Sequence, residues 1–229
     1  MCDDEVHNKM HPNTTMAYQQ GIQGNRVLFV FESPGRFEHE LQRPAVGETG
    51  VHLCMLCERL RALAANSQNE SLRDIGKDFC KVGASIINIA SDWLPEIKSD
   101  TKSGTYKNSY QLTTDERKAI LRQLKQRAEF GSLMRRADVI ICFGRLAWDM
   151  LETIKEKRAM VKRGFCIITT YHLSGRATKF FDGNTWPQKM DNQAQKIYEV
   201  LQEWVNGTDT KIVFDFTNFK KSHKKIDVD

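Results

Sequence analysis

Apolar residues cluster in short runs along the chain, and polar or turn-forming residues bound each run. Such runs predict strands, and they occupy 26–31, 84–90, 137–143 and 165–169, with a further edge strand at 211–216. Ser33, Pro34 and Gly35 force a turn after the first run. The 137–143 run is apolar except at Asp138, which is typical of a strand buried on both faces.

Apolar positions spaced three or four residues apart predict helices between these strands. The first helix spans 51–65, and its apolar face consists of Val51, Met55, Leu56, Leu60 and Leu63. Thr114 is placed to cap a second helix, whose apolar stripe consists of Ile120, Leu121, Leu124 and Ala128. Further helices are predicted over 145–157 and 192–205, and the polar stretch 99–113 is predicted to be a surface loop.

Alternating strands and helices indicate an α/β fold, in which right-handed crossovers place helices on both faces of a mostly parallel sheet. A chain of 229 residues is long enough for one substantial core. We therefore expect a single domain over 26–216, after a polar N-terminal extension, 1–25, and before a basic tail, 217–229. The Lys-rich segment 220–225 is typical of disordered tails, and a DNA clamp is the alternative.

Charge and hydropathy narrow the class of protein further. The net charge of +5 and pI near 8.8 favour a polyanionic partner, although the excess is modest for this length. The longest apolar runs are about five residues, far short of the roughly 20 that cross a bilayer, so we expect no membrane segment. The first 25 residues lack the basic start and apolar stretch of a secretory signal, so we expect a cytoplasmic protein.

Six cysteines in such a chain are expected to be reduced thiols rather than a disulfide framework. Cys142 and Cys166 lie within predicted strands and are expected in the core. Cys54 and Cys57 form a Cys-x-x-Cys pair, which can be half of a metal site. A matching second pair is missing from the sequence, so we expect no metal there.

Polar motifs follow the predicted strands, where parallel sheets carry their ligand sites. In chain order they are Phe31-Glu32-Ser33-Pro34-Gly35, Arg43-Pro44-Ala45-Val46-Gly47-Glu48-Thr49-Gly50, Asn88, Phe143-Gly144-Arg145-Leu146-Ala147 and Tyr171-His172-Leu173-Ser174-Gly175-Arg176. Together, over about 26–178, they resemble the motifs of the uracil-DNA glycosylase superfamily, closest to the branches with a Gly-Glu-Ala/Ser-Pro-Gly motif.

The resemblance implies an enzyme of base-excision repair. Such an enzyme flips a deaminated base, uracil or hypoxanthine, out of single- or double-stranded DNA and hydrolyses its glycosidic bond. We expect it to act as a monomer without a cofactor. The iron–sulfur branch of the superfamily carries a cysteine pair ahead of the first motif, where this chain has only Cys2.

The chemistry of the reaction assigns roles to three of these residues. The base leaves with negative charge while the sugar becomes cation-like. His172 would donate a hydrogen bond to the base carbonyl on which charge accumulates, and Glu32 would orient water or stabilise the sugar cation. Asn88 would read the edge of the flipped base, since its amide both donates and accepts.

The remaining motif residues are expected to contact DNA. Ser33, Pro34, Gly35, Gly47 and Gly50 would bring backbone close to the strand, and Ser174 and Arg176 would contact its phosphates or fill the gap left by the base. The helix after Gly50 would hold a phosphate on its free amides.

Three positions depart from the family pattern. Phe31 replaces a glycine, and its ring would crowd the floor of the pocket; Leu173 replaces a proline. Ala45 replaces the aromatic residue that stacks on the base, a contact worth roughly 1–3 kcal/mol. Phe37 and Tyr171 are candidates to supply the missing ring.

These departures keep other hypotheses open. One is a catalytically inactive nucleic-acid or nucleotide-binding member of the fold, and another is an enzyme that acts on free nucleosides. Taken singly, Glu32 and Asn88 could be turn residues and His172 a structural histidine. Their joint placement after successive strands favours a site.

Overall fold

One seven-stranded sheet, in the order β1-β2-β4-β3-β7-β8-β9, organises the part of the chain that the computed structural model describes. This part comprises 14–15, 17–90, 96–97, 105–106, 113–144, 147, 164–174, 181–207 and 211–214. In sheet order the strands are β1 (Thr14–Thr15), β2 (Tyr18–Gln19), β4 (Ser85–Asn88), β3 (Val27–Phe31), β7 (Val139–Phe143), β8 (Cys166–Thr170) and β9 (Lys211–Phe214). From β4 to β9 all neighbours are parallel, which confirms the predicted α/β architecture.

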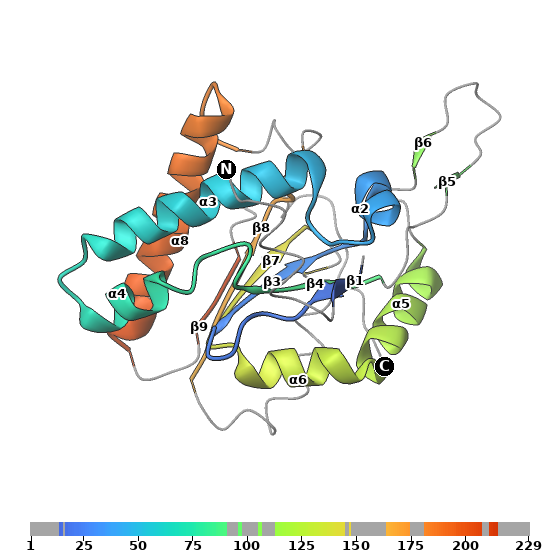
Figure 1. Cartoon of the computed structure of the whole chain (residues 1–229), viewed down its shortest axis with the longest axis horizontal. Helices are drawn as coiled ribbons and strands as arrows, with labels where there is room; N and C mark the ends of the chain where they lie inside the picture. Colours follow the sequence, from blue (N-terminus) through green and yellow to red (C-terminus); the bar gives the residue numbers. More distant parts are fainter. Residues whose placement is uncertain are drawn as a thin grey trace.

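Helices cover both faces of this sheet (Figure 1). They are α2 (Arg36–Leu41), α3 (Gly47–Ala65), α4 (Glu70–Gly76), α5 (Thr114–Gln126), α6 (Ala128–Arg136) and α8 (Trp186–Val205). α3, α4 and α8 lie on one face and α5 and α6 on the other (Figure 1). Strand alternation divides the core accordingly: Phe29 and Phe31 pack toward α3, while Leu28 and Val30 pack toward α5.

The strand order reverses at β3, which marks the position where a sheet of this type can bind a ligand. After β3 the chain continues through α2 and α3 on one face, whereas after β7 it reaches Ala147, a helical residue in the core of the opposite face. In open α/β sheets, ligands bind beyond the carboxyl ends of the strands at such a reversal. Glu32 and Gly144 directly follow β3 and β7, so both lie at this position.

The residues assigned to a polar N-terminal extension include two strands of the sheet. β2 pairs antiparallel with β4, and Gln19 is fully buried there. Its Nε2 donates to the carbonyl oxygens of Lys81 and Ala84, each at 2.9 Å. Burial of this polar segment is possible because its backbone pairs with β4 and the glutamine donors have acceptors.

Two helices begin earlier than the sequence predicts. α3 begins at Gly47 instead of Val51. α8 begins at Trp186 instead of Asn192, because Thr185 and Gln188 form a capping box. The single helix predicted from Thr114 is two helices, α5 and α6. Ala128 is therefore exposed, and Phe130 and Leu133 fill the core in its place.

Several predicted segments fall largely outside the described residues. Only Ala147 of the predicted 145–157 helix is described, and it is buried and helical. A two-stranded ribbon of β5 (Glu96–Ile97) and β6 (Thr105–Tyr106) reaches into the predicted loop. The tail, 217–229, lies outside. Among the helices that the structure describes, none combines the length and apolar character needed to span a bilayer.

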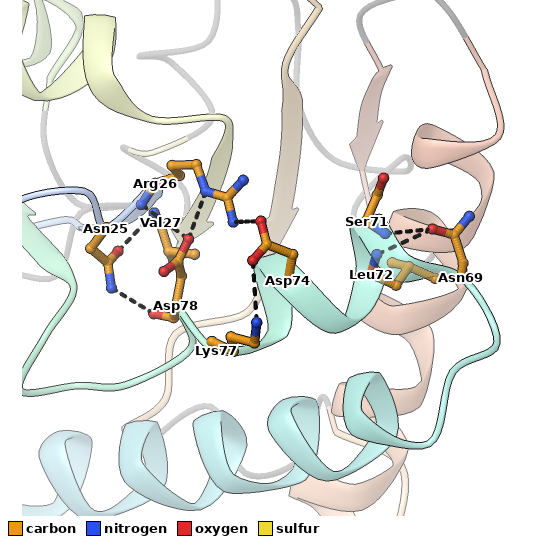
Figure 2. A network of polar contacts seen from close by, with 9 residues as sticks. All are labelled: Asn25, Arg26, Val27, Asn69, Ser71, Leu72, Asp74, Lys77 and Asp78. Atoms are coloured by element: carbon orange, nitrogen blue, oxygen red, sulfur yellow. Dashed lines mark hydrogen bonds and ion pairs between the residues drawn. The ribbon is translucent and has the colours of Figure 1, made fainter.

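A polar network at the amino end of β3 fixes α4 to the sheet (Figure 2). Arg26 Nε donates to Asp78 Oδ2 at 2.8 Å, and Nη2 donates to Asp74 Oδ2 at 2.9 Å. The Arg26 guanidinium lowers the pKa of the Asp74 carboxyl. Asn69 caps α4 by accepting from the amides of Ser71 and Leu72. This network lies at the end of β3 opposite Glu32, so it serves the fold.

Candidate functional site

The predicted site residues that come together are grouped around Phe31, the last residue of β3. Glu32 follows it in the chain, and Asn88 is its partner in the β3–β4 register. The His172 ring lies edge-on to the Phe31 ring, with centroids 5.7 Å apart and planes at 71°. Glu32, Asn88 and His172 are therefore brought to the same edge of the sheet from three different strands.

The Glu32 carboxyl group lies over Gly144, at the end of β7. A β-carbon placed on Gly144 would be 2.5 Å from both Cδ and Oε1 of Glu32, so only glycine leaves room for the carboxylate. Gly144 has φ of +100°, a conformation that also favours glycine. The backbone carbonyl of Glu32 accepts from Ala90 at 2.9 Å. The acidic residue is thus held between the ends of β4 and β7.

His172 is half-buried, and its surroundings favour the neutral ring. Burial lowers the pKa of His172, and the nearby Glu32 carboxylate offsets this effect only in part. The backbone amide of Ser174 donates to His172 Nδ1 at 3.1 Å. Because Nδ1 accepts this bond, the ring proton is on Nε2. His172 is therefore a neutral imidazole whose Nε2–H is a hydrogen-bond donor.

Asn88 is the last residue of β4, and both its backbone amide and its backbone carbonyl are hydrogen-bonded. Its amide donates to Ala17 O at 2.8 Å, and its carbonyl accepts from Arg127 Nη1 at 2.7 Å. Alternation along β4 directs the side chain to the face that α3 covers, and the residue is 2% exposed. The side chain is thus next to Phe31, with its backbone held by Ala17 and by Arg127.

The Phe31 side chain packs into the hydrophobic core. Its ring is 2% exposed and stacks on Phe143 of β7, with centroids 4.7 Å apart and planes at 18°. The same ring supports the edge of His172. The expected crowding by Phe31 therefore takes the form of a packed aromatic layer beneath His172.

A buried carboxylate that the sequence analysis did not single out ties two loops of the site together. Glu38 of α2 accepts from the amide of Gly35 at 2.9 Å and also from the amide of Val46, and Lys81 lies close by. Burial raises the pKa of the Glu38 carboxyl. A glycine at the N-cap with glutamate three residues later is a helix-start signal that could have identified α2.

This arrangement corrects the roles expected for two glycines. The Gly35 amide is occupied by Glu38, and a β-carbon there would lie 2.6 Å from Glu38 Oε2, so glycine makes room for that carboxylate. Gly50 is buried inside α3, and its amide donates to Val46 O at 3.4 Å. Gly50 therefore offers no free amide to a phosphate, because the helix starts at Gly47.

Other predicted contacts fall on the surface or in the core. Gly47 is exposed with φ of +62°, and the Phe37 ring, 58% exposed, packs beside it. Ala45 is buried with φ of +52°. Tyr171 is also buried, edge-on to Phe181, which places its ring in the core and not on the surface.

The first-motif residues Ser33 and Pro34 are half-buried and buried, respectively, and Ser174 contributes its backbone amide to His172. Arg176 lies outside the described residues. Cys142 and Cys166 are buried core thiols, as predicted. Cys57 is buried and Cys54 half-buried, and neither forms a disulfide. No cluster of three or more metal-ligating side chains occurs among the residues that the structure describes.

A scan against models of known protein families finds no match to this chain, and a search of curated proteins finds none.

Proposed function

We propose that the chain is a DNA glycosylase that hydrolyses the glycosidic bond of a deaminated base, uracil or hypoxanthine. The observation that carries the proposal is the pairing of a neutral His172, with its proton on Nε2, with the Glu32 carboxylate at the strand-order reversal. The motif order that resembles the uracil-DNA glycosylase superfamily supports the same reaction.

In this reaction His172 stabilises the leaving base. Negative charge accumulates on a base carbonyl as the glycosidic bond breaks, and Nε2–H donates to that oxygen. A neutral donor is suitable because it keeps its proton while the hydrogen bond strengthens. Removal of one such donor typically costs about 2.7–4 kcal/mol of transition-state stabilisation. The Glu32 carboxylate, held over Gly144, stabilises the cation-like sugar or orients the attacking water.

Other residues of the site would recognise the DNA. The Asn88 amide can both donate to and accept from the edge of a flipped base. Phe37 supplies an exposed ring for stacking on DNA, where such contacts are worth roughly 1–3 kcal/mol per base. Arg36 lies next to it, with its side chain 65% exposed.

The test uses the full chain and oligonucleotides that contain uracil or hypoxanthine, single- and double-stranded, followed by alkali to cut abasic sites. We expect strand breaks with the wild type and a loss of about a hundredfold or more with His172→Gln. Glu32→Gln should lose activity as well. Glu70→Gln is the matched control, because this exposed glutamate belongs to α4, which the Arg26 network holds at the end of β3 opposite Glu32. No breaks with any of these substrates would reject the proposal.

A second candidate is a binding protein that keeps the fold without turnover. Ala45 favours it, because a buried methyl group stands where the related enzymes carry the stacking ring. This candidate predicts salt-sensitive DNA binding that survives both His172→Gln and Glu32→Gln, with no abasic product from the wild type. Turnover that either substitution abolishes would exclude it.

A further inference from the structure

His52 is a buried histidine on α3 whose ring reaches the loop after β8. It is 4% exposed, and its Nδ1 lies 2.7 Å from the carbonyl oxygen of Leu173. A carbonyl oxygen can only accept, so His52 Nδ1–H is the donor. The contact joins residues 121 positions apart in the chain. It ties the second turn of α3 to the segment that carries His172.

The His52 ring also packs against an aromatic side chain. It stacks on Trp186, the first residue of α8, with centroids 3.6 Å apart and planes at 25°. Trp186 packs in turn on Phe181, and Lys189 Nζ lies 5.7 Å from the indole centroid. An imidazole clamped in this way has little freedom to rotate, so the direction of its Nδ1–H is fixed.

The Leu173 carbonyl and the Ser174 amide belong to one peptide group. His52 donates to the oxygen of this group, and the nitrogen of the same group donates to His172 Nδ1. The three groups therefore form a continuous chain of hydrogen bonds from His52 through the 173–174 peptide to His172. Each bond in such a chain polarises the next, which strengthens the amide as a donor.

We propose that His52 is a positioning residue that holds the 173–174 peptide so that its amide keeps the proton of His172 on Nε2. The role deepens the proposed function, on which it rests, because a donor on Nε2 is what the leaving base needs. If His52 is removed, the peptide loses the bond that sets its plane, and the His172 ring can adopt the other tautomer. Nε2 would then be an acceptor facing the base.

Two substitutions separate the hydrogen bond from the packing. His52→Leu keeps an apolar side chain against Trp186 but removes the donor. His52→Asn places its amide nitrogen close to the position of the imidazole Nδ1, so it restores the donor to Leu173 O without the ring. His39→Asn is the matched control, since His39 is an exposed histidine on α2. Urea denaturation of each variant reports the change in stability separately.

The first readout does not depend on catalysis. Long-range ¹H–¹⁵N NMR spectra of the full chain report which nitrogen of His172 carries the proton. We expect the Nε2–H tautomer in the wild type, in His39→Asn and in His52→Asn, and a mixture of tautomers in His52→Leu. A pure Nε2–H tautomer in a folded His52→Leu protein would overturn the proposal, whether or not the chain is a glycosylase.

The second readout is kinetic. In the glycosylase assay His52→Leu should lower kcat about ten- to hundredfold, by analogy with the partners that orient metal-bound histidines, with KM little changed. Among the described residues, Glu32 is the charged group that acts on His172, and it is intact in both variants. The acidic limb of the pH profile should move to higher pH in His52→Leu, because the bond that favours the neutral ring is lost, and His52→Asn should restore it. Equal losses in both variants would indicate a packing role instead and overturn the proposal.

Discussion

Substitution of Gly144 by alanine tests whether the position of the Glu32 carboxyl group determines the rate of the proposed reaction. The added methyl carbon would lie 2.5 Å from Glu32 Cδ and Oε1 and 2.7 Å from Cγ. Non-bonded carbon atoms settle at about 3.5–4.0 Å, so the carboxyl group must move by about 1 Å. A displacement of that size at a reacting group costs about a hundredfold in rate. We therefore expect kcat/KM of Gly144→Ala to fall by about two orders of magnitude.

Gly24→Ala is the matched control for backbone strain. Gly24 has φ of +88°, close to the +100° of Gly144, but an added β-carbon there meets no atom within 4 Å. A residue other than glycine in such a conformation costs of order 1–3 kcal/mol. Gly24→Ala should lose roughly this much in free energy of unfolding, measured with urea, and Gly144→Ala should lose more because of the added contact with Glu32. Only Gly144→Ala should lose activity.

The assay compares initial rates of abasic-site formation on a uracil oligonucleotide for the two variants and the wild type. Equal kcat/KM for Gly144→Ala and Gly24→Ala would refute the reasoning, because it would mean that the Glu32 position over β7 has no bearing on the reaction. A larger loss of stability in Gly144→Ala than in Gly24→Ala would support the contact independently of catalysis.

Phe31→Ala should lower the free energy of unfolding by about 3–5 kcal/mol, because the ring is buried and stacked; an unchanged urea midpoint would contradict this packing. NMR titration should place the pKa of His172 below the ordinary value of about 6.5. The unfolded chain then binds this proton more readily, so stability falls as pH drops from about 6.5 toward the folded pKa, and His172→Gln should remove that part of the slope. Arg26→Met should raise the pKa of Asp74 toward that of a free aspartate, since its guanidinium donates to this carboxylate; a carboxyl ¹³C titration that shows no change would argue against the pair.

Much of the sheet is predictable from sequence because burial on both faces leaves a local pattern. The runs that form β3 and β7 are apolar throughout and that of β8 is apolar up to its two final threonines, and the predicted bounds agree with the structure to within two residues. Glu32 and His172 follow predicted strands, and the order of the motifs adds Asn88, which ends β4 in the structure. Their position relative to strand ends is a property of the local sequence.

The groups that complete the site depend on contacts between distant segments. Glu38 has a helix-start signal, but nothing in the sequence shows that its carboxylate would accept from both Gly35 and Val46. His52 looks like any histidine on a helix until α3 is packed beside the end of β8. The tautomer of His172 is likewise decided by a backbone amide whose direction depends on that packing.

The sequence by itself determined the strand runs, the main helical stripes and the polar residues placed after each strand, because periodicity, burial and turn chemistry act over a few neighbouring residues. The tertiary structure alone decided that β2 joins β4, that Phe31 points into the core, and that Gly144 accommodates Glu32. Those outcomes require the order of strands in the sheet, and that order is set by packing free energy summed over the whole core and not by any local pattern.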